Sequence, residues 1–89
     1  MTDDLTRLDP KRFGLHPRTV LMQDTDGRLF LVMDRKSRII MKDARAVLDK
    51  VMKIRNEIPG ADVALRTTAP VCSKSVRFLE DNGIAVISL

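Results

Sequence analysis

The chain has 89 residues, a size that fits one small domain able to fold alone if its core is efficient. Hydrophobic residues make up 44% and charged residues 31%, a balance that excludes a disordered chain. No run approaches the ~18 consecutive apolar residues of a membrane span. No signal peptide is expected, and the single cysteine, Cys72, excludes an internal disulfide. A cytoplasmic protein with no membrane partner is therefore expected.

Aromatic residues make up only 3% of the chain, so the core must be built from aliphatic side chains and methionine. Such a core lacks the large area that aromatic rings bury. A partner that covers more surface, in a homodimer or in a complex with another protein, fits this composition.

The net charge of +4 is unevenly distributed. Residues 35–55 hold eight lysines and arginines against two acids, whereas residues 1–10 hold three aspartates and one arginine. A cationic segment of this kind attracts phosphate groups, which makes DNA or RNA a candidate partner. The alternative is an ordinary solvated helix face without a ligand.

In chain order, residues 1–18 show weak periodicity and are expected to form a flexible or loosely docked arm. A single small domain is expected over residues 19–89. The segment "TVLMQ" predicts a strand, "DTDG" a turn in which Gly27 supplies the positive φ, and "RLFLVM" the returning strand. The nearly continuous apolar residues of this hairpin indicate that both of its faces are covered.

The segment "DRKS" then predicts a turn or kink before a brief strand, "RIIM". A helix is expected from Asp43, whose carboxylate can accept from the free N–H groups of the helix start, to about Glu57. An apolar stripe with helical spacing supports it: Ala44, Val47, Leu48, Val51, Ile54 and Ile58. The segment "IPG" ends this helix.

The last third predicts a strand, "DVALRT", a loop, "TAPVCSKS", a short helix, "KSVRFLEDNG", and a final strand, "IAVISL". Ser73 is a possible N-cap of that helix, and Gly83 closes it. Strands joined by helices need right-handed crossovers and hence parallel neighbours. The expected fold is α/β, with α+β as the alternative: a small mixed sheet with an N-terminal hairpin and two helices, in the order ββ(β)αβαβ. Both helices can lie on one face and leave the other open to a partner.

Two segments, "FLVMDRKSRIIMKDARAVLDKVMKI" and "VALRTTAPVCSKSVRFLEDNGIAVISL", resemble the closing part of restriction-endonuclease-like proteins of the PD-(D/E)xK superfamily. The nearest likeness is to the type IV restriction enzyme and Holliday-junction resolvase branches. In those proteins a strand carries (D/E)xK, a helix follows, and a later strand ends in small Thr or Ser residues before a short helix and a "GI" step. The resemblance covers residues 19–89 and implies that Asp34 takes the acidic position and Lys36 the lysine.

The chemistry explains these residue types, because carboxylates hold a Mg²⁺ ion that neutralises charge on the phosphodiester while a lysine positions water. Residues two apart on a strand point the same way, as Asp34 and Lys36 would. The alternative is that they belong to a charged turn.

The family pattern also needs an earlier aspartate on the preceding strand, where this chain offers Arg18, Thr19 and Val20. Asp24 and Asp26 lie in the turn, at the far end of the hairpin. The N-terminal helix that usually carries another acid is absent or reduced to "DDLTRL". The resemblance therefore implies a trimmed, degenerate relative with an incomplete site.

The loop "TTAPVCSKS" precedes the second helix and can bind an anion through Ser73, Lys74 and Ser75, although ordinary capping is the simpler interpretation. The helix dipole and Lys74 favour a lowered pKa for Cys72. The alternative is a structural or incidental cysteine without a chemical role. His16 is the only histidine and reads as a loop residue rather than a metal ligand.

Three functions follow as hypotheses. The first is a non-catalytic module, without a cofactor, that contacts the nucleic-acid backbone through a basic turn and helix. Its residues are Arg35, Lys36, Arg38, Lys42, Arg45, Lys50 and Lys53. The second is a protein-interaction or oligomerisation domain that uses the open sheet face. The third is a nuclease that uses Asp34 and Lys36, and it alone requires Mg²⁺.

Overall fold

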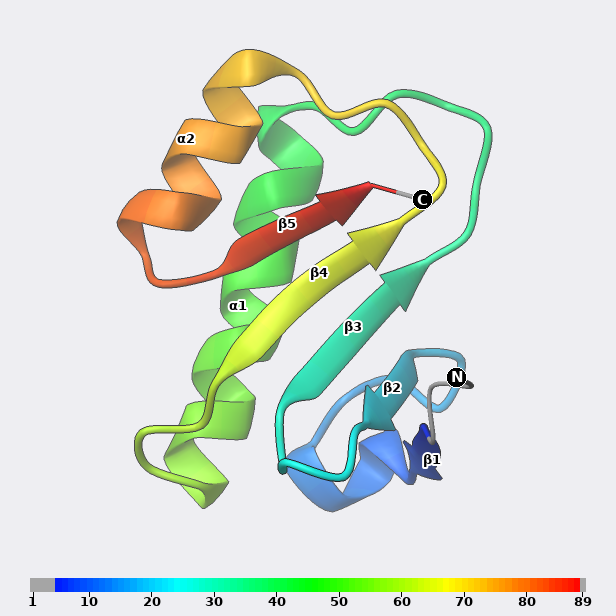
Figure 1. Ribbon diagram of the computed structural model, residues 1–89, viewed down its shortest axis with the longest axis vertical. Helices are drawn as coiled ribbons and strands as arrows, with labels where there is room; N and C mark the ends of the chain where they lie inside the picture. Colours follow the sequence, from blue (N-terminus) through cyan, green and yellow to red (C-terminus); the bar gives the residue numbers. More distant parts are fainter. Residues whose placement is uncertain (1–4, 89) are drawn as a thin grey trace.

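The computed structural model describes residues 5–88, which form one mixed sheet and its helices (Figure 1). The elements in chain order are β1 (Thr6–Leu8), η1 (a 3-10 helix, Pro10–Phe13), β2 (Val20–Gln23), β3 (Leu29–Met33), α1 (Met41–Glu57), β4 (Val63–Thr67), α2 (Ser73–Asp81) and β5 (Ala85–Ser88). The expected mixed sheet with an N-terminal hairpin and two α-helices is confirmed. None of the helices within residues 5–88 is long and apolar enough to cross a membrane.

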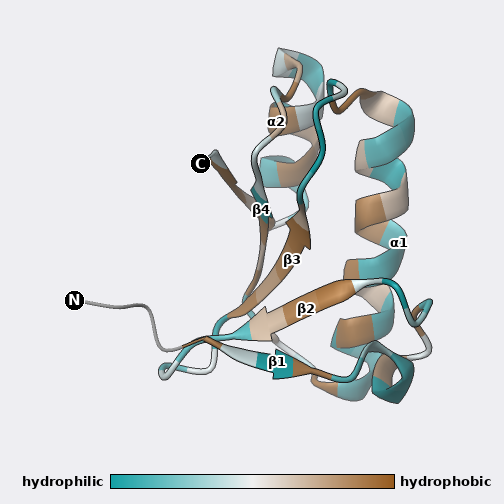
Figure 2. Cartoon of the chain, turned by 90° about the vertical axis from the view of Figure 1, so that its right-hand side faces the viewer, coloured by the Kyte–Doolittle hydropathy of each residue, from teal (hydrophilic) through white to brown (hydrophobic). Residues whose placement is uncertain are grey.

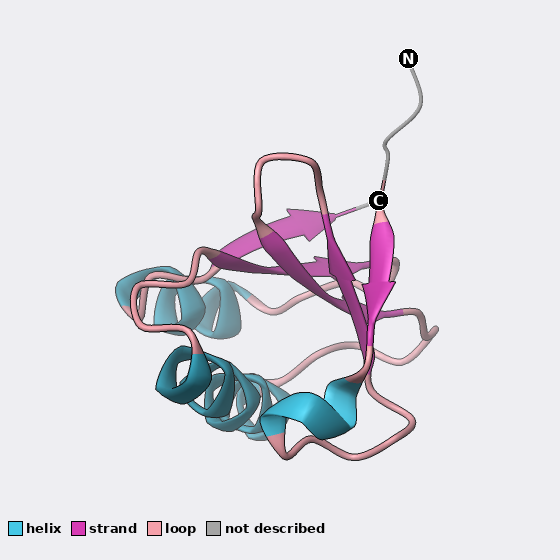
Figure 3. Ribbon diagram, turned by 90° about the horizontal axis from the view of Figure 1, so that it is seen from below, coloured by secondary structure: helices cyan, strands magenta, loops and turns pink. Residues whose placement is uncertain are grey.

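The five strands are ordered in the sheet as they are in the chain, from β1 to β5. The β1–β2 and β2–β3 pairs are antiparallel, whereas the β3–β4 and β4–β5 pairs are parallel. Each parallel pair is joined by a helix, as a crossover requires. Both α-helices lie on the same side of the sheet (Figure 3), as the chain order allowed.

The core lies between this side of the sheet and α1. Of the predicted apolar stripe, the helix buries Ala44, Val47, Val51 and Ile54. Leu48 is half-buried, and Ile58, just past the end of the helix, is exposed. Leu21, Leu29, Leu31, Val63 and Leu65 supply the strand side of the same cluster. Hydrophobic residues are concentrated along the strands in Figure 2. Since a fully buried aliphatic side chain contributes roughly 1.5–3 kcal/mol, this layer supplies the main stabilisation of the fold.

A flexible or loosely docked arm was expected for residues 1–18, but several residues between 6 and 15 belong to the sheet or to the core. Strand β1 pairs with β2, from Thr6 opposite Gln23 to Leu8 opposite Leu21. Phe13 and Leu15 are 4% and 5% exposed and belong to the core. A strand of three residues and one turn of 3-10 helix are too short to produce a readable period. The prediction for residues 1–4 lies outside the described residues.

The brief strand expected at "RIIM" is also corrected. Only Ile39 pairs, in an isolated parallel bridge with Val71. Ile40 is already the N-cap of α1, which begins at Met41. The second half of this apolar run, Ile40 and Met41, forms the start of α1, because the chain leaves the sheet at this point to cross over to β4.

Asp43 lies in the first turn of α1 and ties the preceding loop to the helix. Its Oδ2 atom accepts from the backbone N–H of Ile40 at 3.0 Å and from Arg35 Nη2 at 2.7 Å. The Arg35 guanidinium also donates to the carbonyls of Ser37 and Arg38. The Ile40 hydrogen bond, followed by the Arg35 contact, lowers the pKa of the Asp43 carboxyl. Asp43 therefore accepts a hydrogen bond at the start of the helix, as predicted, but it does so from the third residue of α1, while Ile40 is the N-cap.

We expect Asp43→Asn to lower the free energy of unfolding by about 1 kcal/mol near neutral pH, because it weakens a charge-assisted bond and a helix-start bond. The folded-state pKa of Asp43 is depressed, so its contribution is full above the ordinary carboxyl pKa and is lost as the pH falls through the folded-state value. Urea unfolding near neutral pH and at about pH 3 should show the difference from wild type shrinking in acid.

Asp49→Asn is the matched control, since it removes the same charge from the exposed side of the same helix. An equal loss of stability in this variant would contradict the specific role of Asp43.

Candidate nucleic-acid interface

Two loops meet at the carboxyl edge of the parallel strands, residues 34–40 after β3 and residues 68–72 after β4 (Figure 1). Ile39 N–H donates to the Pro70 carbonyl at 2.8 Å, and Cys72 N–H donates to the Ile39 carbonyl at 3.1 Å. Ligands of open α/β sheets bind outside this edge. Asp34, Lys36 and the loop before α2 are therefore brought to one end of the molecule.

Thr67, the last residue of β4, links the two loops at this edge through its side chain. Its side chain is buried, and its hydroxyl donates to the Met33 carbonyl at 2.7 Å and accepts from Ala69 N–H at 3.0 Å. The next residue, Thr68, donates its hydroxyl to Asp34 Oδ1 at 2.8 Å. The small hydroxyl residues that end β4 thus hold the β3 loop in place.

Asp34 and Lys36 are both exposed and lie in the loop, because β3 ends at Met33. The alternation of side chains along a strand therefore does not apply to them. Asp24 and Asp26 belong to the tight turn between β2 and β3, where Asp24 Oδ1 accepts from Asp26 N–H. The register pairs Gln23 with Leu29 at that end, opposite to the end that leads to Asp34.

The Mg²⁺ site that the resemblance implies can be tested against these positions. Such a site takes oxygen ligands, carboxylates foremost. Within residues 5–88, no group of three or more His, Cys, Asp and Glu side chains is arranged to hold a metal ion. Asp34 Oδ1 accepts from the Thr68 hydroxyl, and the stretch Arg18, Thr19 and Val20 stands where the pattern has its first aspartate. This edge does not supply the pair of carboxylates that the resemblance implies.

The seven basic residues predicted to contact nucleic acid separate into different environments. Arg35 is in an ion pair with Asp43. Lys50 is half-buried and lines a pocket beside the N-terminal loop. The others are exposed: Lys36, Arg38, Lys42, Arg45 and Lys53.

A shallow groove of about 440 Å³ between α1 and α2 brings Arg45 together with Lys74, which was predicted only for the anion-binding loop, and with Arg77, which the sequence interpretation did not include. Arg45 of α1 and Lys74 and Arg77 of α2 line it, with Met41 and Phe78 as apolar lining and Asp81 as its one acidic lining residue. Lys74 and Arg77 are three residues apart and so share one face of α2, which is the only sequence signal for their grouping. We call the exposed cations of this end the basic surface: Lys36, Arg38, Lys42, Arg45, Lys74 and Arg77.

The predicted anion-binding loop is only partly exposed. Cys72 is the N-cap of α2, and Ser73 is its first residue. Ser75 is buried, with its Oγ atom 2.8 Å from Cys72 Sγ, whereas Ser73 and Lys74 are exposed. The Ser75 hydrogen bonds, from its side chain and then its backbone, lower the pKa of the Cys72 thiol, and the charge of Arg38 adds to this effect. Ser75 is therefore hydrogen-bonded to the Cys72 thiol and is buried, so its hydroxyl is not accessible to a ligand.

No protein-family model and no curated protein sequence matches this chain. Solved structures do match. EndoMS in a complex with dsDNA is 23% identical with a TM-score of 0.74, over 96% of this chain and 36% of that one. EndoMS in its apo form is 24% identical with a TM-score of 0.64, over 79% and 33%. A repair endonuclease from Pyrococcus abyssi is 15% identical with a TM-score of 0.65, over 79% and 31%.

This chain thus spans about a third of the length of the proteins that it matches in structure. Identities this low establish the fold and nothing more specific. The restriction-endonuclease-like fold that the sequence resemblance implied is therefore the fold of this chain.

Proposed function

We propose that this chain is a module that binds nucleic-acid phosphates through the basic surface and does not cleave them. The observation that carries the proposal is the groove in which Arg45 of α1 lies with Lys74 and Arg77 of α2. Three cations from two helices, against the single acid Asp81, leave this concavity with a net positive charge, which favours an anionic polymer over isolated solvated charges.

The surroundings of the groove support phosphate binding. Both α1 and α2 begin at this edge of the sheet, so the positive ends of two helix dipoles are directed toward it (Figure 1). Met41 and Phe78 line the same groove. Apolar surface of this kind suits the aliphatic stems of arginines whose charged ends reach solvent. Contacts of this kind position a backbone without reading its bases.

Duplex DNA is the ligand that we favour. The matched EndoMS structure is a complex with dsDNA, and the fold of this chain is shared with it over 96% of its residues. At 23% identity this likeness supports the choice of ligand only as part of the proposal.

The proposal that the chain does not cleave nucleic acid rests on which carboxylates are present at the carboxyl edge of the parallel strands. Hydrolysis of a phosphodiester needs charge neutralisation and an activated water, which a metal held by carboxylates supplies. Asp34 accepts from Thr68, and the region of the earlier family aspartate holds Arg18, Thr19 and Val20 instead. The residues present favour binding over cleavage.

A triple variant, Arg45→Gln, Lys74→Gln and Arg77→Gln, should weaken binding of a fluorescent duplex by at least about tenfold, because three phosphate contacts are lost. Anisotropy titrations over a range of salt concentrations should also give a shallower dependence of log K on log salt, by roughly 0.9 per lost contact.

The control variant neutralises three exposed cations at the other end of the molecule, Arg7, Lys11 and Arg12. Equal weakening in both triple variants, or wild-type binding that does not respond to salt, would exclude the basic surface as the interface.

Incubation of plasmid DNA and RNA with Mg²⁺ or Mn²⁺ should leave both intact, because a second carboxylate does not accompany Asp34. The variants Asp34→Ala and Lys36→Ala serve as controls. Cleavage by wild type that disappears in both variants would overturn the non-catalytic proposal in favour of a metal-dependent nuclease. Cleavage that persists in both would identify a contaminating nuclease.

A further inference from the structure

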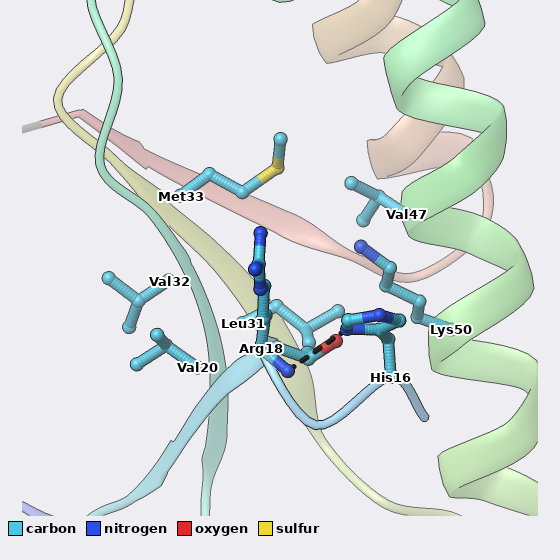
Figure 4. A pocket seen from close by; sticks show the side chains of 9 residues that line it. His16, Arg18, Val20, Leu31, Val32, Met33, Val47 and Lys50 are labelled. Carbon is cyan, nitrogen blue, oxygen red and sulfur yellow. Dashed lines mark hydrogen bonds between the residues drawn. The ribbon is translucent and has the colours of Figure 1, made fainter. Parts of the chain in front are cut away.

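A second concavity lies on the opposite flank of α1 from the basic groove. It has a volume of about 290 Å³ and is enclosed by the loop before β2, strands β2 and β3, and α1 (Figure 4). Leu31, Met33 and Val47 are among its apolar lining residues. Its polar lining consists of His16, Arg18, Thr19 and Lys50.

Two cations converge on this pocket. In Figure 4 the Arg18 guanidinium and the Lys50 ammonium both extend into the space between Met33 and Val47. Within residues 5–88, no salt bridge involves either cation, and none of the nine described residues that line the pocket is acidic. Like charges directed over an apolar surface repel each other, so an anion between them would stabilise the arrangement.

The other polar groups of the pocket are suited to the same ligand. His16 Nδ1 accepts from the backbone N–H of Arg18 at 3.1 Å, which places the hydrogen of the neutral imidazole on Nε2. The ring therefore offers a donor, and the Thr19 hydroxyl offers another. A site made of donors and cations selects acceptors with negative charge.

The pocket also explains what replaces the implied metal site. The residues that line it from the start of β2 are Arg18, Thr19 and Val20, the same three that stand where the resemblance requires an aspartate. Here the positive charge comes from side chains on the loop and on α1 instead of from a metal held by carboxylates. A pocket lined by cations instead of carboxylates is expected to bind an anionic ligand directly, without a metal ion.

We propose that this pocket binds a phosphate monoester, with the phosphoryl group between Arg18 and Lys50 and the organic part against Leu31, Met33 and Val47. The charge of a monoester approaches −2 at neutral pH, which matches two cations better than the single charge of a diester or a carboxylate. The volume lies near the lower end of small-molecule sites, which limits the ligand to about the size of one nucleotide.

This inference goes beyond the proposed function, because the duplex-binding groove is lined by other residues and binds internal phosphates. The monoester could come from a free mononucleotide or from the 5′-terminal phosphate of a strand, and the two sources share the same chemistry. The experiment distinguishes them.

The test is a titration of the full chain, followed by amide NMR shifts and calorimetry. The probes are adenosine 5′-monophosphate, a 5′-phosphorylated dinucleotide, and the unphosphorylated forms of both. We expect at least one phosphorylated probe to bind, with shifts at residues 16–20 and 47–50, and its unphosphorylated form to bind at least about tenfold more weakly. The phosphorylated probe that binds more tightly identifies the source.

Two matched pairs of variants locate the site. Thr19→Asp adds a negative charge to the pocket and should weaken binding by at least about tenfold more than Thr19→Asn, which removes the same hydroxyl and has the shape of aspartate without its charge. Lys50→Gln should also weaken binding, whereas Lys53→Gln, one turn away on the exposed side of α1, should not. Circular dichroism verifies that every variant is folded.

The inference is overturned if neither phosphorylated probe binds, if the unphosphorylated forms bind equally well, or if either pair of variants behaves alike. Its failure is separable from that of the proposed function. The triple variant of the basic surface should keep monoester binding, and Thr19→Asp should keep duplex binding.

Discussion

The parallel pairing of β3 with β4 is the interaction on which the rest of the molecule depends. It requires the chain to cross over through α1, which then packs its apolar stripe on the strands and supplies the core. The buried Thr67 hydroxyl fastens the end of this pair to the Met33 carbonyl. Without that pairing, the loops after β3 and β4 would not meet, and the amino ends of the two α-helices would not share one edge.

The position of α1 creates two electropositive regions of different character. Its first turns carry Lys42 and Arg45 to the carboxyl edge, where α2 adds Lys74 and Arg77. Its third turn directs Lys50 toward the N-terminal loop, which brings Arg18. An exposed groove suits a polymer that is held by many weak, screened contacts, whereas a smaller, partly apolar pocket suits one compact anion.

A shared fold does not by itself carry chemistry with it. The sheet and helices match endonuclease structures with TM-scores up to 0.74, although this chain spans only about a third of those proteins. Catalysis depends on a few side chains that the fold holds but does not dictate. At the start of β2 this chain has a basic and a hydroxyl residue, and after β3 its acid is bound to Thr68. The consequences for function must be drawn from those side chains.

The sequence alone determined the elements whose periods are long enough to read. Strands β2 to β5, helices α1 and α2 and the apolar stripe of α1 follow from local patterns. Strand β1 escaped detection because it has three residues, and the apolar run at Ile39 and Ile40 divides between a bridge and a helix start. Only the tertiary structure decided which charged side chains lie together: Arg35 with Asp43, Arg45 with Lys74 and Arg77, and Lys50 with Arg18. Periodicity reports neighbours within a few residues, whereas these groupings depend on how distant segments pack across the sheet and its crossovers.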